Sequence, residues 1–143
     1  MDPSAIVYPA IAMFFLTFAS IANMARVRIG AVQAGEMSVG FYRTYDEGAE
    51  TPRLRRVTRH VQNLFEVPPL FYVVLIFLYV TGTVTALAVG LAWLYVALRC
   101  VHAFVHLGSN NVQHRLIAFL SSGLVLAGLW LVLLIGLLGS RAA

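Results

Sequence analysis

The chain has 143 residues, of which 60% are hydrophobic and 11% are charged, whereas soluble domains carry about 25% charged residues. Ten arginines against six acidic residues make the chain basic, but its total charge is too low to indicate nucleic-acid binding, and one cysteine excludes an internal disulfide or a Cys-x-x-Cys site. This composition predicts an all-α integral membrane protein, a single domain over residues 1–143 with about four spanning helices.

The first predicted helix spans about 5–25, because no charged residue lies between Asp2 and Arg26. This stretch is too long, and too poor in small residues near its end, for a cleaved signal peptide. The segment 26–55 follows as the one sizeable polar loop.

A helical hairpin is predicted next, because the uncharged stretch 67–98 contains a turn-forming sequence at 81–85. The turn separates helices over about 56–80 and 84–107. Each arm then has only about 13 apolar residues, against about 20 needed to span a membrane. Polar residues that flank the stretch must therefore enter the membrane, and both groups do so at the same depth. The prolines at 68–69 should kink the first arm.

A fourth helix over about 115–138 completes the predicted four-transmembrane-helix bundle. Nine of the ten arginines belong to the 26–55 loop, to the start of the second helix or to the connection between the third and fourth helices. Arg141 alone lies on the other side. The positive-inside rule therefore places the arginine-rich loops in the cytoplasm and both termini on the opposite side.

Polar residues of the second and third helices are predicted to converge at membrane depth. At 100° per residue, each group falls within an arc of about 60–80° on its helix. The groups are Arg56, Arg59, Asn63 and Glu66 on the second helix, and Arg99, His102 and His106 on the third. Ionisable residues at such depth face a bundle interior or a wet cavity and usually mark function.

A pocket with several arginines and one carboxylate suits an anionic ligand that carries one ammonium group. Arginine side chains bind carboxylates, and Glu66 would bind the amine. Cys100 points about 100° away from Arg99 and is expected to be a buried, inert thiol. Any nucleophile would therefore arrive with the ligand.

Simpler interpretations of the same residues remain open. Glu66 could form a structural ion pair with Arg59 or Arg99, with the other arginines extending to the membrane surface. A channel is a further alternative, but it would need polar residues along the whole span, and the outer halves of both helices are apolar.

Histidine spacing raises two cofactor alternatives. His102 and His106 have the i, i+4 spacing of metal ligands, and Glu66 with His60 or His114 would have to complete the site. His60 and His102 on facing helices could also hold a haem. The surrounding arginines repel cations, so we expect no metal.

Two runs of residues resemble signatures of the MAPEG superfamily, the membrane-associated proteins in eicosanoid and glutathione metabolism. The run from Arg56 to Phe71 resembles its second-helix pattern R-x-x-R-x-x-x-N-x-x-E followed by proline. The segment 99–106 is similar to its third-helix pattern R-x-x-H-x-x-x-Y, and Arg115 matches the arginine that follows. The resemblance covers essentially the whole chain in length, helix count and motif order.

The resemblance implies a homotrimer of four-helix subunits that binds glutathione between neighbours near the cytoplasmic surface. A lipophilic electrophile would enter from the membrane lipids, and no nucleic acid or metal would be involved. Arg115 would be the catalytic residue, holding the thiolate of glutathione. The glutathione-binding residues would be Arg26, Arg59, Asn63, Glu66, Arg99, His102 and His106.

Four positions depart from better-characterised branches of the superfamily. His106 stands where the pattern has tyrosine. Gln62 stands where prostaglandin E synthase-like members have arginine, and Leu116 stands where they have serine. Val67 stands where leukotriene C synthase-like members have tyrosine. These changes disfavour eicosanoid-specific activities. They leave a general glutathione S-transferase or peroxidase as the expected function, with a non-catalytic lipid- or ligand-binding scaffold as the alternative.

Overall fold

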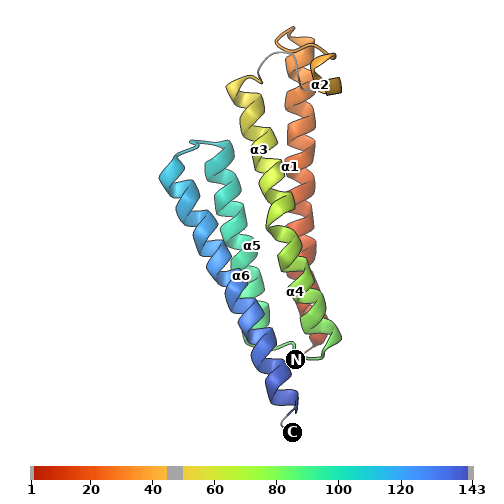
Figure 1. Cartoon of the computed structure of the whole chain (residues 1–143), viewed down its shortest axis with the longest axis vertical. Helices are drawn as coiled ribbons and strands as arrows, with labels where there is room; N and C mark the ends of the chain where they lie inside the picture. Colours follow the sequence, from red (N-terminus) through yellow and green to blue (C-terminus); the bar gives the residue numbers. More distant parts are fainter. Residues whose placement is uncertain (1, 45–49, 142–143) are drawn as a thin grey trace.

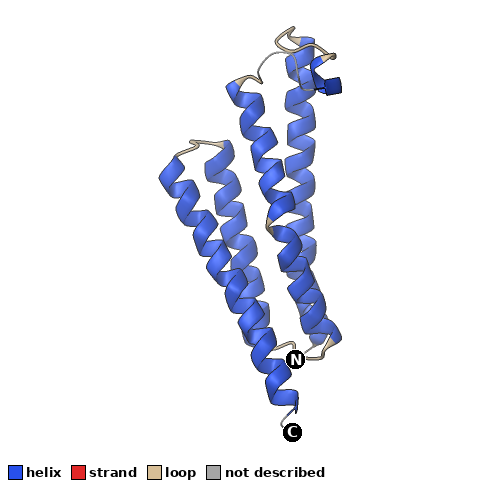
Figure 2. Cartoon of the chain, in the orientation of Figure 1, coloured by secondary structure: helices blue, strands red, loops and turns tan. Residues whose placement is uncertain are grey.

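The computed structural model describes residues 2–44 and 50–141, and the side chains of all of these except 44, 140 and 141. Within this part of the chain every regular element is a helix (Figure 2). Four segments, 3–33, 52–80, 86–107 and 112–139, are long and apolar enough to cross a membrane. The elements are η1 (Pro3–Ile6), α1 (Val7–Gln33), α2 (Phe41–Thr44), α3 (Pro52–Glu66), α4 (Pro68–Val80), α5 (Ala86–Leu107) and α6 (Val112–Arg141).

The long helices form a bundle of two neighbouring pairs (Figure 1). α5 packs most extensively on α6, and α1 packs along α3. Both ends of the chain lie at the same end of the bundle, and the loop that contains α2 lies at the other end. An even number of spans accounts for this arrangement of the termini.

Helix boundaries follow from local capping. The Thr51 hydroxyl accepts a hydrogen bond from the Leu54 amide at 3.3 Å, and Pro52 occupies the first turn of α3. The Thr85 hydroxyl accepts from the Ala88 amide at 3.1 Å at the start of α5. These caps place the 81–85 turn and the hairpin close to the predicted positions.

The second span is interrupted at Val67, as the two prolines predict. α3 ends at Glu66 and α4 begins at Pro68. Neither Pro68 nor Pro69 has an N–H to donate to the preceding helical turn, so the helix cannot continue unbroken. The polar residues of the span lie on α3, and α4 is almost entirely apolar.

α1 extends eight residues beyond the predicted end of the first helix. Loss of hydrophobicity marks the edge of the membrane, whereas the helix itself ends where its backbone is capped. Gly35 has a left-handed φ of 71°, and the Glu36 amide donates to the Ala31 carbonyl at 2.9 Å. The polar loop is therefore shorter than predicted; its residues 45–49 lie outside the described part of the chain.

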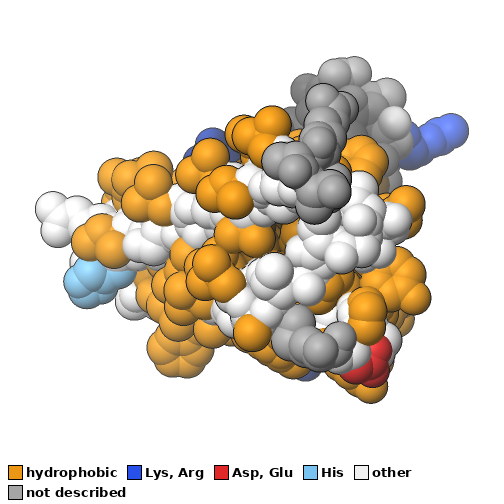
Figure 3. All heavy atoms as spheres, turned by 90° about the horizontal axis from the view of Figure 1, so that it is seen from below, with side chains coloured by type: hydrophobic (Ala, Val, Ile, Leu, Met, Phe, Trp, Pro, Cys, Tyr) orange, Lys and Arg blue, Asp and Glu red, His pale blue; other side chains and the backbone are white. Residues whose placement is uncertain are grey.

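The buried hydrophobic residues form two separate clusters. The smaller one joins the loop to α1 and α3 and comprises Ala31, Met37, Phe41 and Leu54. The main core draws residues from η1, α1, α3, α4, α5 and α6, and at its centre Phe71 stacks on Tyr95 with ring centroids 4.3 Å apart. Seen from the end that carries the termini, the surface is mostly hydrophobic (Figure 3).

Candidate functional site

A cavity of about 390 Å³ opens among α3, α5 and α6. Its volume lies within the range of about 300–1,000 Å³ that is usual for small-molecule sites. Six of the eight residues predicted to form a site line it. The lining consists of Arg59, Gln62, Asn63, Glu66, His102, His106, Val112, Arg115, Leu116 and Phe119.

The cavity is expected to lie at membrane depth. Twenty residues are enough to cross the hydrocarbon region, so a span that ends at Val80 enters the membrane near Val61. At 1.5 Å per residue Glu66 is then about 8 Å inside. The side chain is exposed in the single chain, and it makes no ion pair with any described residue. The structural ion pair with Arg59 or Arg99 is therefore not formed among these residues.

Arg99 forms the base of the site without lining the cavity. Its side chain is 0% exposed, and Nη2 donates hydrogen bonds to the side-chain and main-chain oxygens of Asn63. Since the amide oxygen of Asn63 accepts from Arg99, its NH₂ group is available to the cavity. Nε and Nη1 of Arg99 are buried without a hydrogen-bond partner.

Arg115 lies at the start of α6, after the turn that follows α5. Asn110 in this turn has a left-handed φ of 51°, and its side-chain oxygen accepts a hydrogen bond from Arg115 Nη1 at 3.0 Å. The guanidinium is half-buried and lines the cavity. The turn thus holds a positive charge at the cavity that Glu66 and His106 also line.

Two arginines from the sequence analysis lie elsewhere. Arg26 is exposed on α1, donates to Asn23 at 2.8 Å and lines a different cavity beside the loop. Arg56 donates to the Leu107 carbonyl at 3.5 Å and the Gly108 carbonyl at 3.0 Å, which ties α3 to the end of α5. Within one chain the structure therefore does not bring Arg26 to the residues with which it was grouped.

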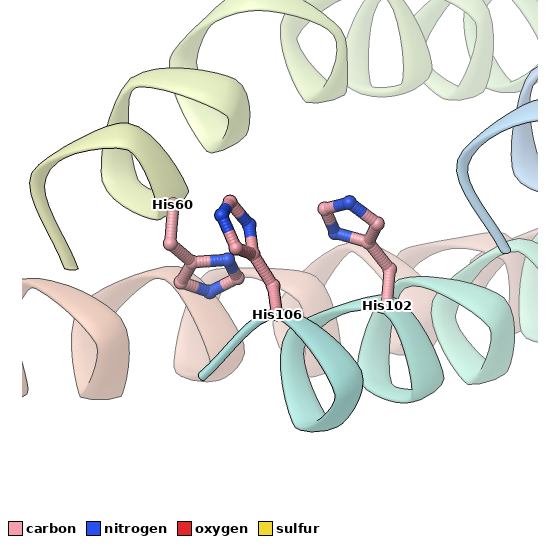
Figure 4. Close-up of side chains that lie close together, drawn as sticks. All are labelled: His60, His102 and His106. Carbon is pink, nitrogen blue, oxygen red and sulfur yellow. The ribbon is translucent and has the colours of Figure 1, made fainter. Parts of the chain in front are cut away.

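Three buried histidines lie close together (Figure 4). His60 comes from α3, and His102 and His106 come from α5; only the last two line the cavity. The ring centroids of His106 lie 5.4 Å from those of both His60 and His102. This crowding leaves no space for a porphyrin between His60 and His102, so the geometry does not fit the haem alternative.

His60 was considered only as a ligand in the metal and haem alternatives, and it was not among the predicted site residues. It lies on the packing face of α3, four residues before the buried Leu64 and three after the buried Val57. That helical spacing is the signal that could have placed it inward. Cys100 was expected to be buried, but its side chain is exposed. Because Arg99 points into the bundle, the next residue points out of it.

Comparison with protein families supports the resemblance seen in the sequence. The model of the MAPEG family matches residues 6–135, a region that contains every residue lining the cavity. Comparisons with curated proteins and with solved structures found no match.

Proposed function

The chain belongs to the MAPEG family, and from this we propose that it is a membrane-bound glutathione S-transferase acting on lipophilic electrophiles. One observation carries the proposal. Glu66 and Asn63 of α3 line a single cavity with Arg115 of α6. One carboxylate, one amide and a guanidinium match the groups that glutathione offers.

Glutathione has two carboxylates, one ammonium group and one thiol. Arg59 and the NH₂ group of Asn63 are the donors suited to its carboxylates. Glu66 has no basic partner among the described residues, so its carboxylate is available for the ammonium group. Arg99 acts indirectly by fixing the orientation of the Asn63 amide.

Arg115 is the residue proposed to activate the thiol. A free thiol has a pKa of about 8.5, and a neighbouring cation lowers it, so more thiolate is present at neutral pH. The thiolate sulfur forms a bond to the electrophilic carbon, and a leaving group departs with the electron pair of the broken bond. The thiol proton passes to solvent.

The electrophile is proposed to reach the site from the lipid. Val112, Leu116 and Phe119 form an apolar wall of the cavity on α6, and the first two are exposed on the surface of the bundle. A lipophilic molecule can therefore approach the sulfur without crossing the arginine-rich side.

Assembly into a homotrimer is part of the proposal, and α3 supplies its physical reason. Arg55, Arg59, Gln62 and Glu66 recur at helical spacing and are all exposed in the single chain. Of these, Gln62 and Glu66 lie within the twenty residues that end at Val80, where a charged group is costly when it faces lipid. A second copy of the chain against this face would shield them and close the cavity.

Calorimetry on purified protein in detergent tests the proposal. We expect glutathione to bind at millimolar concentration or below, and S-methylglutathione to bind while supporting no conjugation. Turnover with a panel of electrophiles and lipid hydroperoxides then separates transferase from peroxidase. Binding without turnover would favour the scaffold alternative, and no binding at millimolar glutathione would refute the proposed ligand.

A further inference from the structure

His60, His102 and His106 form a buried cluster, of which only His102 and His106 were expected to contact glutathione. One ring nitrogen from each lies within 4.8 Å of those of the other two. All three side chains are buried, with exposed fractions of 1%, 3% and 5%. Three imidazoles from two helices therefore converge in one place (Figure 4).

A hydrogen bond fixes the tautomer of His60. The Ser20 hydroxyl donates its hydrogen to the Leu16 carbonyl at 2.8 Å, and Ser20 Oγ lies 3.2 Å from His60 Nε2. Because that hydrogen is already donated, Ser20 Oγ accepts, and Nε2 of His60 carries the proton. Nδ1 of His60 therefore has a free lone pair.

The Nδ1 atoms of all three histidines are buried without a hydrogen-bond partner. Unpartnered buried nitrogens of this kind are rare in proteins and call for a physical explanation. In metal sites a ligating histidine commonly donates its second N–H to an oxygen, which holds the ring in place. Ser20 does this for His60.

We propose that His60, His102 and His106 bind one divalent transition-metal ion of the zinc class. Imidazole nitrogens about 2.0–2.1 Å from zinc lie roughly 3.3–3.4 Å apart in a tetrahedral site, so small rotations of the rings would complete the geometry. Three histidines leave a fourth position open. This position faces the cavity, because His102 and His106 line it.

The surrounding arginines set the nature of the fourth ligand. Arg56, Arg99 and Arg115, which belong to the arginines from which we expected no metal, each donate to neutral oxygens of the protein. These hydrogen bonds solvate the guanidinium groups but leave their charge in place. The positive field favours an anion at the open position. The thiolate proposed for glutathione has that charge and is a ligand that zinc-class ions prefer. This last step rests on the proposed function, whereas the three-histidine site does not.

Cobalt binding tests the site directly. The protein is used without a polyhistidine tag, treated with chelator and titrated with Co²⁺ in detergent. We expect one Co²⁺ per chain, visible d–d absorption typical of four-coordinate cobalt, and competition by Zn²⁺. His60→Gln should weaken binding by about 100-fold or more, and Ser20→Ala by about 10-fold, because it removes only the outer hydrogen bond. His114→Gln, an exposed histidine outside the cluster, is the matched control.

The thermal unfolding of each variant is measured without metal, so that misfolding is recognised. If His60→Gln does not fold, Ser20→Ala carries the test, since it leaves all three rings in place. Absence of stoichiometric Co²⁺ binding to the wild type, or equal affinity in Ser20→Ala, would overturn the proposal. Glutathione binding is measured by calorimetry on the chelator-treated protein as an independent test. If this protein binds glutathione but does not bind Co²⁺, the metal site is refuted and the proposed function is unaffected.

Discussion

Arg99 of α5 and Asn63 of α3 join the two helices inside the membrane-spanning part of the bundle. The guanidinium is fully buried, and both of its hydrogen bonds go to Asn63. Removing the acceptor of a buried charged donor costs about 1–3 kcal/mol or more. We expect Asn63→Leu to lower the free energy of unfolding by at least this amount, as measured by thermal unfolding in detergent. Asn63→Asp, which keeps an acceptor, should cost less, and Gln62→Leu is the control. Equal unfolding of Asn63→Leu and wild type would contradict this role.

Glu66 is expected to bind the ammonium group of glutathione. Glu66→Gln should weaken binding by about 1.5–3 kcal/mol, the range for a hydrogen bond to a charged group. The unfolding temperature should change little, because the carboxylate has no ion-pair partner among the described residues. Calorimetry measures the affinity, and Glu36→Gln beside the loop is the control. A Glu66→Gln variant that binds glutathione normally would show that the carboxylate has another role.

Removing the Arg115 side chain is expected to reduce turnover while leaving glutathione affinity nearly unchanged. In Arg115→Ala the pKa of the thiol of bound glutathione should rise toward about 8.5. Thiolate absorbance at neutral pH should therefore fall. Affinity should change little, since other residues hold the carboxylates and amine. Turnover should fall and recover partly at higher pH, where the thiol ionises unaided. Arg115→Lys should keep part of the activity, and the exposed Arg43→Ala is the control. Wild-type thiolate absorbance and rate in Arg115→Ala would assign thiol activation to another residue.

Gly136 allows α6 to approach the turn between α4 and α5. A Cβ at this position would lie 2.9 Å from Thr83 Cβ and 3.1 Å from Thr83 Cγ2. Gly136→Ala should therefore destabilise the bundle by about 1–3 kcal/mol, the usual cost of overpacking. Thr83→Gly should restore much of this loss. Gly139→Ala is the matched control, because its Cβ meets nothing within 4 Å. Thermal unfolding is compared for Gly136→Ala, for Gly136→Ala combined with Thr83→Gly, and for Gly139→Ala. Unchanged stability in Gly136→Ala would mean that the turn moves aside at little cost.

Orientation in the membrane is tested by labelling single cysteines in a Cys100→Ser background. Ser109→Cys lies in the turn between α5 and α6, and Ala86→Cys lies at the opposite end of α5. The arginine distribution predicts that an impermeant maleimide labels Ala86→Cys in intact cells. Ser109→Cys should react only after permeabilisation. The reverse pattern would place the arginine-rich loops outside.

The helices and most of the cavity-lining residues can be predicted from the sequence for physical reasons. Missing charges marked the spans, and the short hairpin required Glu66 and His102 to enter the membrane together. Helical spacing then grouped the residues that the structure places in one cavity. The end of α1 was missed because hydrophobicity does not determine where a helix is capped. Arg26 lies on the part of α1 that extends past the predicted end and lines a different cavity of its own chain, so its contact with glutathione between subunits stays a prediction.

Other features depend on three-dimensional contacts that spacing alone does not contain. The hydrogen bond from Arg99 to Asn63 joins residues 36 apart in the sequence, and that from His60 to Ser20 joins residues 40 apart. Periodicity can place each residue on a face, but it does not determine which face of a neighbouring helix it meets.

The break at Val67 gives the second span a pivot next to the cavity. It separates α3, which carries Arg59, Asn63 and Glu66, from the apolar α4, which packs in the main core. A small tilt of α3 about this point would carry its three polar side chains toward or away from α5 while α4 stayed seated. Leu64 is the residue of α3 in the main core, so such a tilt would change the width of the cavity while the rest of the lipid-embedded core stayed packed.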